Sequence, residues 1–312
     1  MTRAMSHKES AAASALALGL LSLCLFYASA LVAPLGLLAP APLYYVLVRR
    51  GRGTGLVLMT GAGLALMIAS GPGSAILFLG VCGVMALALA ESFRRGDSLE
   101  KTMGTAVLWP YVSGAVLLFM AASPGGMAQV LTSFGSQTLA AYIESYHRLG
   151  VDADTMRWLE ENGAWLVDVF VRVFPALSFV SVVAMAAVNL LVIRTLSLKF
   201  GWGVHGGDHE FSSWATPDSF VWTVVAGGFG MALFDGTMQT VSINLLACAL
   251  TVYAIQGVSM VHWFFTKSNV PIFLRAVGYF IIFSYPLLLA LLSFAGLADV
   301  WADFRKQAAE RP

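Results

Sequence analysis

Apolar runs, most of them close to the length that crosses a lipid bilayer, recur along almost the whole chain. A helix needs about 20 apolar residues to span the hydrocarbon layer. Because backbone polar groups in lipid must bond to one another, only helices and closed barrels can span it. The runs lack the alternation of barrel strands and so predict helices. They cover residues 11–33, 35–48, 56–70, 75–91, 105–122, 164–198, 216–234, 241–265 and 272–297.

The composition agrees with a membrane protein. Of the 312 residues, 58% are hydrophobic and 11% are charged, whereas a soluble domain carries about 25% charged residues. We therefore predict an all-α, polytopic transmembrane helical bundle with about eight or nine membrane segments. Residues 1–312 are expected to form a single integral membrane domain, with the lipid bilayer as its first partner. The net charge of +1 favours no nucleic-acid partner.

The first two runs need separate interpretation. Residues 11–33 follow Arg3 and Lys8, as the core of a signal peptide would, but they exceed the usual core of about 7–15 residues, so we expect a retained span. Residues 35–48 are short and contain Pro40 and Pro42. Proline disrupts helices, so this segment is expected to be broken or re-entrant rather than to cross alone.

Two segments are expected outside the lipid. Residues 123–163 are an acidic insert, in which an amphipathic helix is predicted from the spacing of Leu139, Tyr142, Ile143 and Tyr146. Residues 297–312 form a tail in which apolar residues recur at helical spacing, which predicts an interfacial helix with Asp303 and Arg305 facing water. The apolar residues of the tail are Leu297, Val300, Trp301 and Phe304.

Polar residues within spans are the candidates for function, because polar groups at bilayer depth need partners. Asp168 and Arg172 lie four residues apart and predict a mutually neutralising ion pair. The amides of Asn189, Asn244 and Gln256 are candidates either for hydrogen bonds between helices or for ligand binding. Thr216 is expected to cap the helix that follows Pro217.

No catalytic or metal-binding pattern stands out. The loop segment His205-Gly-Gly-Asp208-His209-Glu210 has ligand-type side chains, but its composition is typical of any loop between spans, and no metal is predicted. No Ser/His/Asp, Cys/His or HExxH constellation is present. We expect a protein that is not an enzyme and has no cofactor.

Three pieces of the C-terminal third resemble a known family. They are Phe211-Ser-Ser-Trp214-Ala-Thr-Pro217, Tyr253-Ala-Ile-Gln256-Gly257, and Gly296-Leu-Ala-Asp299-Val-Trp301-Ala-Asp303-Phe304-Arg305-Lys306, and Asn244 between the first two adds to the likeness. With Pro40-Ala-Pro42 and Arg49-Arg50-Gly51, they resemble the YybS-like family of bacterial polytopic membrane proteins, a domain of unknown function (DUF2232). The resemblance implies no reaction. The first half is also similar to the substrate-binding S-components of energy-coupling-factor transporters, a likeness of fold that transfers no function.

Two functions remain open from the sequence. One is a non-enzymatic, transport-type protein that binds a small solute among its helices. The other is a structural or assembly protein that holds membrane-protein partners. A polar cavity enclosed by helices would favour the first function, and a solid interior the second.

The distribution of Lys and Arg predicts the orientation. Basic residues concentrate in the loop after Val48 and around Arg94, so both loops are expected in the cytoplasm of a bacterium, with the N-terminus, while residues 123–163 face outward. Reporter fusions in the inner membrane should report the acidic insert as external. Cytoplasmic reporter activity from a fusion within residues 123–163 would show that the orientation is wrong.

Overall fold

The computed structural model describes residues 2–28, 33–121, 126–200, 208–302, 304 and 305, and these form helices with no strand among them. The chain divides into two compact units, which are considered separately. Unit 1 comprises residues 1–174 and 181–205, and unit 2 comprises residues 175–180 and 206–312. The all-helical prediction is confirmed for the described residues.

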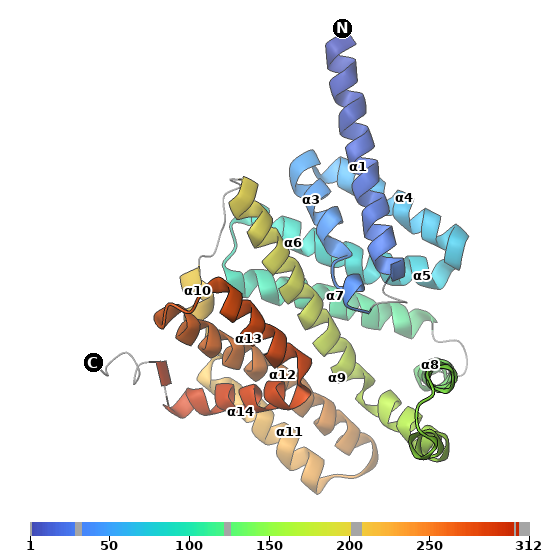
Figure 1. Cartoon of the computed structure of the whole chain (residues 1–312), viewed down its shortest axis with the longest axis vertical. Coiled ribbons are helices and arrows are strands. Elements are labelled where there is room, and N and C mark those ends of the chain that lie inside the picture. The colour runs from blue at the N-terminus through green and yellow to red at the C-terminus, as the bar shows by residue number, and fades with distance from the viewer. Residues whose placement is uncertain (1, 29–32, 122–125, 201–207, 303, 306–312) are drawn as a thin grey trace. The chain divides into compact units, whose positions relative to one another are not determined.

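Unit 1 contains the helices that precede the long helix α9, together with the larger part of α9. In chain order they are α1 (Thr2–Ala28), α2 (Ala33–Gly36), α3 (Pro40–Arg50), α4 (Arg52–Ser70), α5 (Pro72–Leu77), the π-helix η1 (Phe78–Gly83), α6 (Val84–Arg95), α7 (Leu99–Ala121), α8 (Gly126–Leu149) and the larger part of α9 (Ala153–Phe200). The short helix α3 packs against α1, α4 and α6 (Figure 1). Its side chains from Leu43 to Leu47 are mostly buried. The predicted broken segment is thus a short helix inside unit 1.

The turn of π-helix within unit 1 has a local reason. A π-turn leaves backbone carbonyl groups poorly matched to the regular helical hydrogen bonds. The hydroxyl of Ser113, on α7, donates a hydrogen bond to the carbonyl oxygen of Gly80 within η1. The irregular backbone is therefore satisfied by the neighbouring helix.

Helices α8 and α9 form an antiparallel hairpin within unit 1. The Cα of Gly135 faces Phe170, Gly163 faces Leu139, and His147 lies beside Glu160. Gly150, with a φ of +69°, lies in the turn between the helices, where the left-handed backbone favours glycine. The residues predicted to form an amphipathic helix, 139–146, are helical within α8.

Unit 2 contains the C-terminal helices. They are α10 (Asp208–Ser213), the 3₁₀-helix η2 (Asp218–Phe220), α11 (Val221–Leu233), α12 (Gly236–Lys267), α13 (Ile272–Ser284) and α14 (Pro286–Ala302). Helix α12 packs against both α11 and α14 (Figure 1). It is the central helix of the unit, and it carries two of the three candidate amides.

The structure refines one expectation for unit 2 and contradicts another. The predicted span 272–297 consists of two helices, α13 and α14, which meet at a bend of 100° and together can count as one broken span. Pro286 disfavours helical backbone at Tyr285, which has an extended ψ of 104°. A helix does begin after Pro217, but the side chain of Thr216 does not cap it. The backbone N–H of Thr216 bonds to Gln256 instead.

The number of spans that the helices support is smaller than the predicted one. Among the described residues, five helices are long and apolar enough to cross a membrane, or six if the bent pair counts as one span. They are Arg52–Ser70, Pro72–Arg95, Leu99–Met120, Ala153–Ser197 and Gly236–Lys267. Two shorter apolar helices, Ala13–Ala28 and Asp218–Leu233, add to these.

Glycines allow α12 and α14 to approach closely. A Cβ added to Gly257 would lie 2.2 Å from the carbonyl oxygen of Leu292, and one added to Gly296 would lie 2.2 Å from that of Tyr253. Both obstacles are backbone atoms, which cannot rotate away as a side chain can. Small residues at helix contacts are typical of membrane bundles, where close backbone packing replaces the hydrophobic driving force.

Gly296→Ala should therefore destabilise the protein, because α14 must move away from α12. Overpacking of this kind costs roughly 1–3 kcal/mol, so the melting temperature in detergent should fall. Gly228→Ala in α11 is the matched control, since no atom lies within 4 Å of its added Cβ. Equal melting temperatures for the two variants would contradict the packing argument.

Candidate functional site

A network of buried polar groups in unit 2 joins α12, α14 and the segment between α10 and η2. Gln256 is 1% exposed and Asp299 is 5% exposed. The Gln256 Nε2 group donates to Asp299 Oδ2 at 3.1 Å, and Gln256 Oε1 accepts the backbone N–H of Thr216 at 2.9 Å. Both ends of the candidate amide are therefore bonded to protein atoms.

Arg305 closes the network from the tail. Its NH2 group lies 3.0 Å from Asp299 Oδ2, and its NH1 group donates to the carbonyl oxygens of Ser212 at 2.8 Å and Trp214 at 3.0 Å. The side chain of Arg305 is 13% exposed and that of Asp299 is 2% exposed. The expectation that Arg305 faces water was wrong, because its guanidinium group bonds to Asp299 and to the carbonyl oxygens of Ser212 and Trp214. Asp303 lies outside the described residues.

Further groups of the network are also matched, whereas the buried hydroxyl oxygen of Thr216 has no hydrogen-bond partner among the described residues. Asp299 Oδ1 accepts the backbone N–H of Phe304 at 3.0 Å. The hydroxyl of Ser259, one turn after Gln256, donates to the carbonyl oxygens of Phe211 at 2.6 Å and Trp214 at 3.2 Å. A buried charge pair is stable only when such additional hydrogen bonds satisfy it. The arrangement therefore acts as a clamp that holds the tail and the α10–η2 segment to α12.

The clamp brings together the three sequence pieces that carry the family resemblance. Ser212, Trp214 and Thr216 come from the first piece, Gln256 from the second, and Asp299 and Arg305 from the third. Sequence reasoning singled out Gln256 but missed Asp299 and Arg305 as its partners. The available signal was Asp299 as the only charge among the apolar residues 291–302, whereas its spacing of six residues from Arg305 fits no single helical face.

Asn244 lies on the same helix as Gln256 and has a different partner. Its Oδ1 accepts the backbone N–H of Ala176 at 2.8 Å, and its Nδ2 donates to the carbonyl oxygen of Thr240 at 2.8 Å. Ala176 follows Pro175, which interrupts the hydrogen bonds of α9 because proline has no N–H group. Asn244 thus satisfies a backbone group beside a helix irregularity, and Gln256 lies in a separate set of contacts.

Asn189 belongs to unit 1 and is fully buried. Its Nδ2 donates to the carbonyl oxygens of Leu37 at 2.6 Å and Met185 at 2.7 Å. Leu37 lies in the break between α2 and α3, so the amide covers a carbonyl group that no helix satisfies. No described residue donates a hydrogen bond to Asn189 Oδ1, so this oxygen is buried without a partner.

The ion pair predicted between Asp168 and Arg172 has the geometry of a surface pair. Arg172 Nε lies 2.9 Å from Asp168 Oδ2, and each side chain is 54% exposed. An exposed pair of this kind contributes little stability. The four-residue spacing on α9 accounts for the contact.

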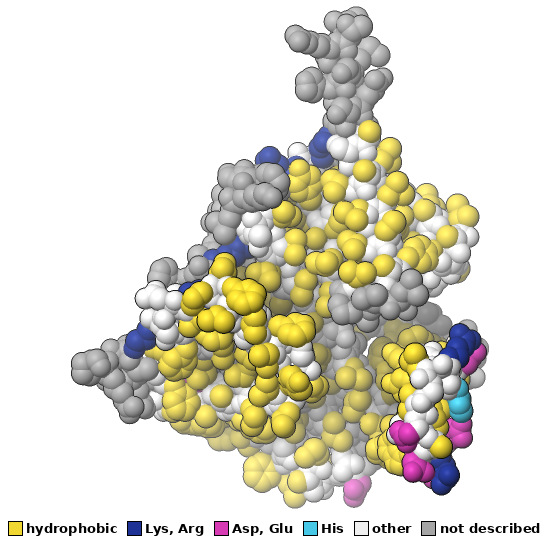
Figure 2. Space-filling model, viewed as in Figure 1, with side chains coloured by type: hydrophobic (Ala, Val, Ile, Leu, Met, Phe, Trp, Pro, Cys, Tyr) yellow, Lys and Arg dark blue, Asp and Glu magenta, His cyan; other side chains and the backbone are white. Residues whose placement is uncertain are grey.

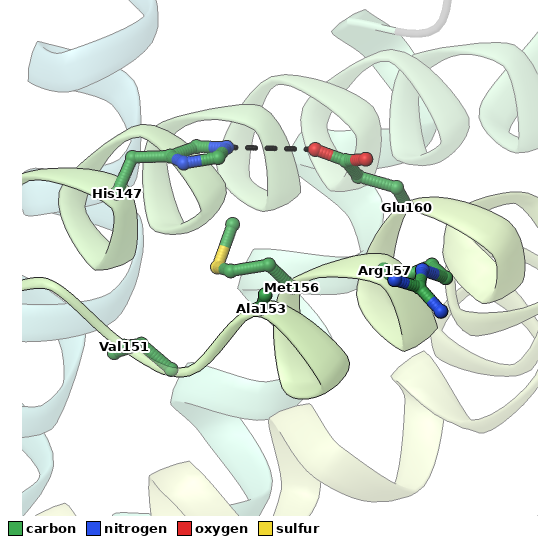
Figure 3. Close-up of a pocket in the computed structure, with 6 residues that line it drawn as sticks. All are labelled: His147, Val151, Ala153, Met156, Arg157 and Glu160. Atoms are coloured by element: carbon green, nitrogen blue, oxygen red, sulfur yellow. Dashed lines mark ion pairs between the residues drawn. The ribbon is translucent and has the colours of Figure 1, made fainter.

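The tip of the α8–α9 hairpin contains a hollow of about 370 Å³ (Figure 3). His147 Nε2 lies 3.4 Å from Glu160 Oε1 across it, and both side chains are more than half exposed. Val151, Ala153, Met156 and Arg157 form the rest of its lining. The hollow is wide open and contains both polar and apolar side chains, which is typical of a contact surface rather than of an enclosed small-molecule site.

The described residues contain no cluster of three or more side chains suited to hold a metal ion. Of the segment 205–210, residues 205–207 lie outside the described residues, as do the side chains of residues 208–210. The prediction on that segment therefore has no structural test.

The clamp predicts that the two Asp–Arg pairs differ greatly in how much they stabilise the protein. Asp299→Ala leaves the buried Arg305 and Gln256 without their shared acceptor, and breaking a buried pair costs about 3–5 kcal/mol. Asp168→Ala removes an exposed pair and should cost about 0–1 kcal/mol. Thermal melting of both variants in the same detergent measures the difference. Similar melting temperatures would show that the Asp299 network does not stabilise unit 2.

Comparison with known proteins gives one match. A family described as predicted membrane protein (DUF2232) matches residues 16–300. The match reaches into both units and covers the first two pieces, but it includes the third piece only as far as Val300. No curated protein and no solved structure matches the chain. The chain therefore belongs to this family of predicted membrane proteins.

Proposed function

We propose that the chain is a non-enzymatic assembly protein of a bacterial inner membrane, whose helices anchor it and whose α8–α9 hairpin holds a protein partner. The observation that carries this proposal is the use of the amides in unit 2. Gln256 and Asn244 each accept and donate hydrogen bonds within the protein. A solute site needs polar groups that face a space, whereas the oxygen and the nitrogen of both amides are bonded to protein atoms.

The α8–α9 hairpin, unlike the buried amides, exposes its polar side chains on the surface. Its charged side chains pair with near neighbours on the surface, as Glu144 does with Arg148 and Asp154 with Arg157, and all four are at least two-thirds exposed. Such pairs contribute little to the fold, so their charges are available to a partner. Figure 2 shows acidic, basic and histidine side chains gathered on this hairpin, beside hydrophobic ones.

Exposed aromatic and apolar residues support a protein partner rather than a small ion. Tyr142 is 57% exposed, Trp158 is 50% exposed, and Leu149 at the end of α8 is 77% exposed. Aromatic anchors surrounded by polar groups are typical of protein interfaces. The combination of these side chains with the open hollow at His147 and Glu160 fits a folded surface of mixed polarity.

A second candidate function, solute binding, is favoured by Asn189. The unmatched Oδ1 of this residue lies at a break in the helical backbone, and broken helices often form the binding sites of membrane transporters. A solute with a hydrogen-bond donor would satisfy the oxygen. A core like that of an energy-coupling-factor S-component would also fit this function, and it stays a prediction.

A photoreactive amino acid at position 149 tests the assembly proposal. In cells, irradiation should join this position to one discrete protein, because Leu149 is exposed beside the hollow. The same amino acid at position 273 is the matched control: Phe273, on α13, is 73% exposed, and it should give only lipid adducts. Glu144→Lys with Glu160→Lys should reduce the adduct from position 149 by reversing the charges there.

A different set of results would contradict the assembly proposal. Solute binding would replace the assembly function if two results came together. Position 149 would give no discrete protein adduct. A small molecule would co-purify with the natural chain but not with Asn189→Leu, and the two chains would have the same melting temperature. Mass spectrometry of the purified protein identifies both proteins and solutes.

A further inference from the structure

Five arginines gather at one end of unit 1, where several helices begin or end. Helix α3 ends with Arg49 and Arg50, α4 begins at Arg52, and α6 ends with Arg94 and Arg95. Because α4 and the Pro72–Arg95 segment are consecutive antiparallel spans, the start of one and the end of the other reach the same membrane surface. Arg52 indeed forms an ion pair with Glu91, one turn before the end of α6.

Glu91 holds three of these guanidinium groups together. Besides Arg52, its carboxylate pairs with Arg95 Nε at 3.1 Å and lies 3.7 Å from Arg94 NH1. Arg94 also donates through NH2 to the carbonyl oxygen of Leu47 at 2.6 Å, which ties α6 to α3. One carboxylate therefore faces three cations, and the group retains a net positive charge. The helices hold these cations close together although they repel one another.

The neighbouring acid does not neutralise this cluster. Asp97 pairs with Lys101 at 2.6 Å. The Lys101 ammonium holds the pKa of Asp97 below its usual range, so the pair has no net charge at neutral pH. Glu100 lies nearby in the first turn of α7, but with Arg49 and Arg50 the arginines still outnumber the acids. Figure 2 shows Lys and Arg side chains on unit 1 near α3.

The arginines have donors left for an external anion. The side chains of Arg52 and Arg95 are each 60% exposed, although each contacts Glu91. A guanidinium group carries five N–H donors in a planar fork that matches a phosphate, so Glu91 occupies only part of this capacity. One helical turn after Arg52, α4 exposes Leu56 and Val57. Further along the helix it exposes Leu64 and Ile68. An anion with an attached hydrocarbon chain would contact both features.

We infer that this arginine cluster binds the phosphate group of an anionic phospholipid, whose acyl chains lie along the apolar side chains of α4. A free phosphate would use the same N–H donors but not the apolar side chains. The lipid site concerns unit 1 alone and does not depend on the proposed partner of the hairpin.

Native mass spectrometry of the full chain in a nonionic detergent tests the inference, with phosphatidylglycerol and phosphatidylcholine as the two probes. The natural chain should bind phosphatidylglycerol more tightly, and excess inorganic phosphate should not displace it. Arg52→Gln with Arg95→Gln should weaken phosphatidylglycerol binding roughly tenfold, since each basic residue near an anionic surface contributes appreciably. Arg148→Gln, which removes an exposed and paired arginine of α8, is the matched control and should leave binding unchanged.

A third variant separates the effect of the arginine charges on lipid binding from an effect on folding. Glu91→Gln removes the shared carboxylate and leaves the cations, so phosphatidylglycerol binding should be equal or stronger at a lower melting temperature. Equal binding of both lipids by the natural chain would overturn the inference, as would undiminished binding in the double variant with an unchanged melting temperature. Displacement by inorganic phosphate would show that the site takes free phosphate and not a lipid.

Discussion

Inside a bilayer no water is available to a backbone group that leaves the helical pattern, and several buried polar contacts of this protein follow from that constraint. Three irregularities are matched by side chains from elsewhere. Ser113 bonds to the carbonyl of Gly80 in the π-helix, Asn189 to that of Leu37 in the α2–α3 break, and Asn244 to the N–H of Ala176 after Pro175. Polar residues within the spans thus have a structural explanation before any functional one.

The same constraint separates the charges into two classes. Asp299 and Arg305 are buried, and their remaining capacity is matched by Gln256 and by backbone groups. The charges of the α8–α9 hairpin and of the arginine cluster stay exposed and pair with neighbours without using all of their donors. Exposed charges of this kind contribute little to stability. They are therefore where interactions with a partner or a lipid are expected.

The bonded amides of unit 2 favour an assembly function over the solute-binding function that an amide-rich span first suggests. Amides in a solute site must face a space, whereas Gln256 and Asn244 are engaged at both ends. Asn189 Oδ1 is the exception, and it keeps solute binding as the second candidate. The hairpin offers exposed aromatic residues, charges and an open hollow, which together resemble a protein contact surface.

The sequence by itself determined the helical membrane class, because the apolar runs are long and lipid permits few alternatives. It also predicted the short segment with Pro40 and Pro42 and the ion pair spacing of Asp168 and Arg172, since these depend on local geometry. It singled out Gln256 but not its partners. Thr216, Asp299 and Arg305 meet Gln256 only through the packing of α14 on α12, which depends on Gly257 and Gly296. The bonds from Arg305 to the carbonyl oxygens of Ser212 and Trp214 were likewise decided by tertiary structure, because contacts between residues far apart in the chain leave no periodic signal in a single sequence.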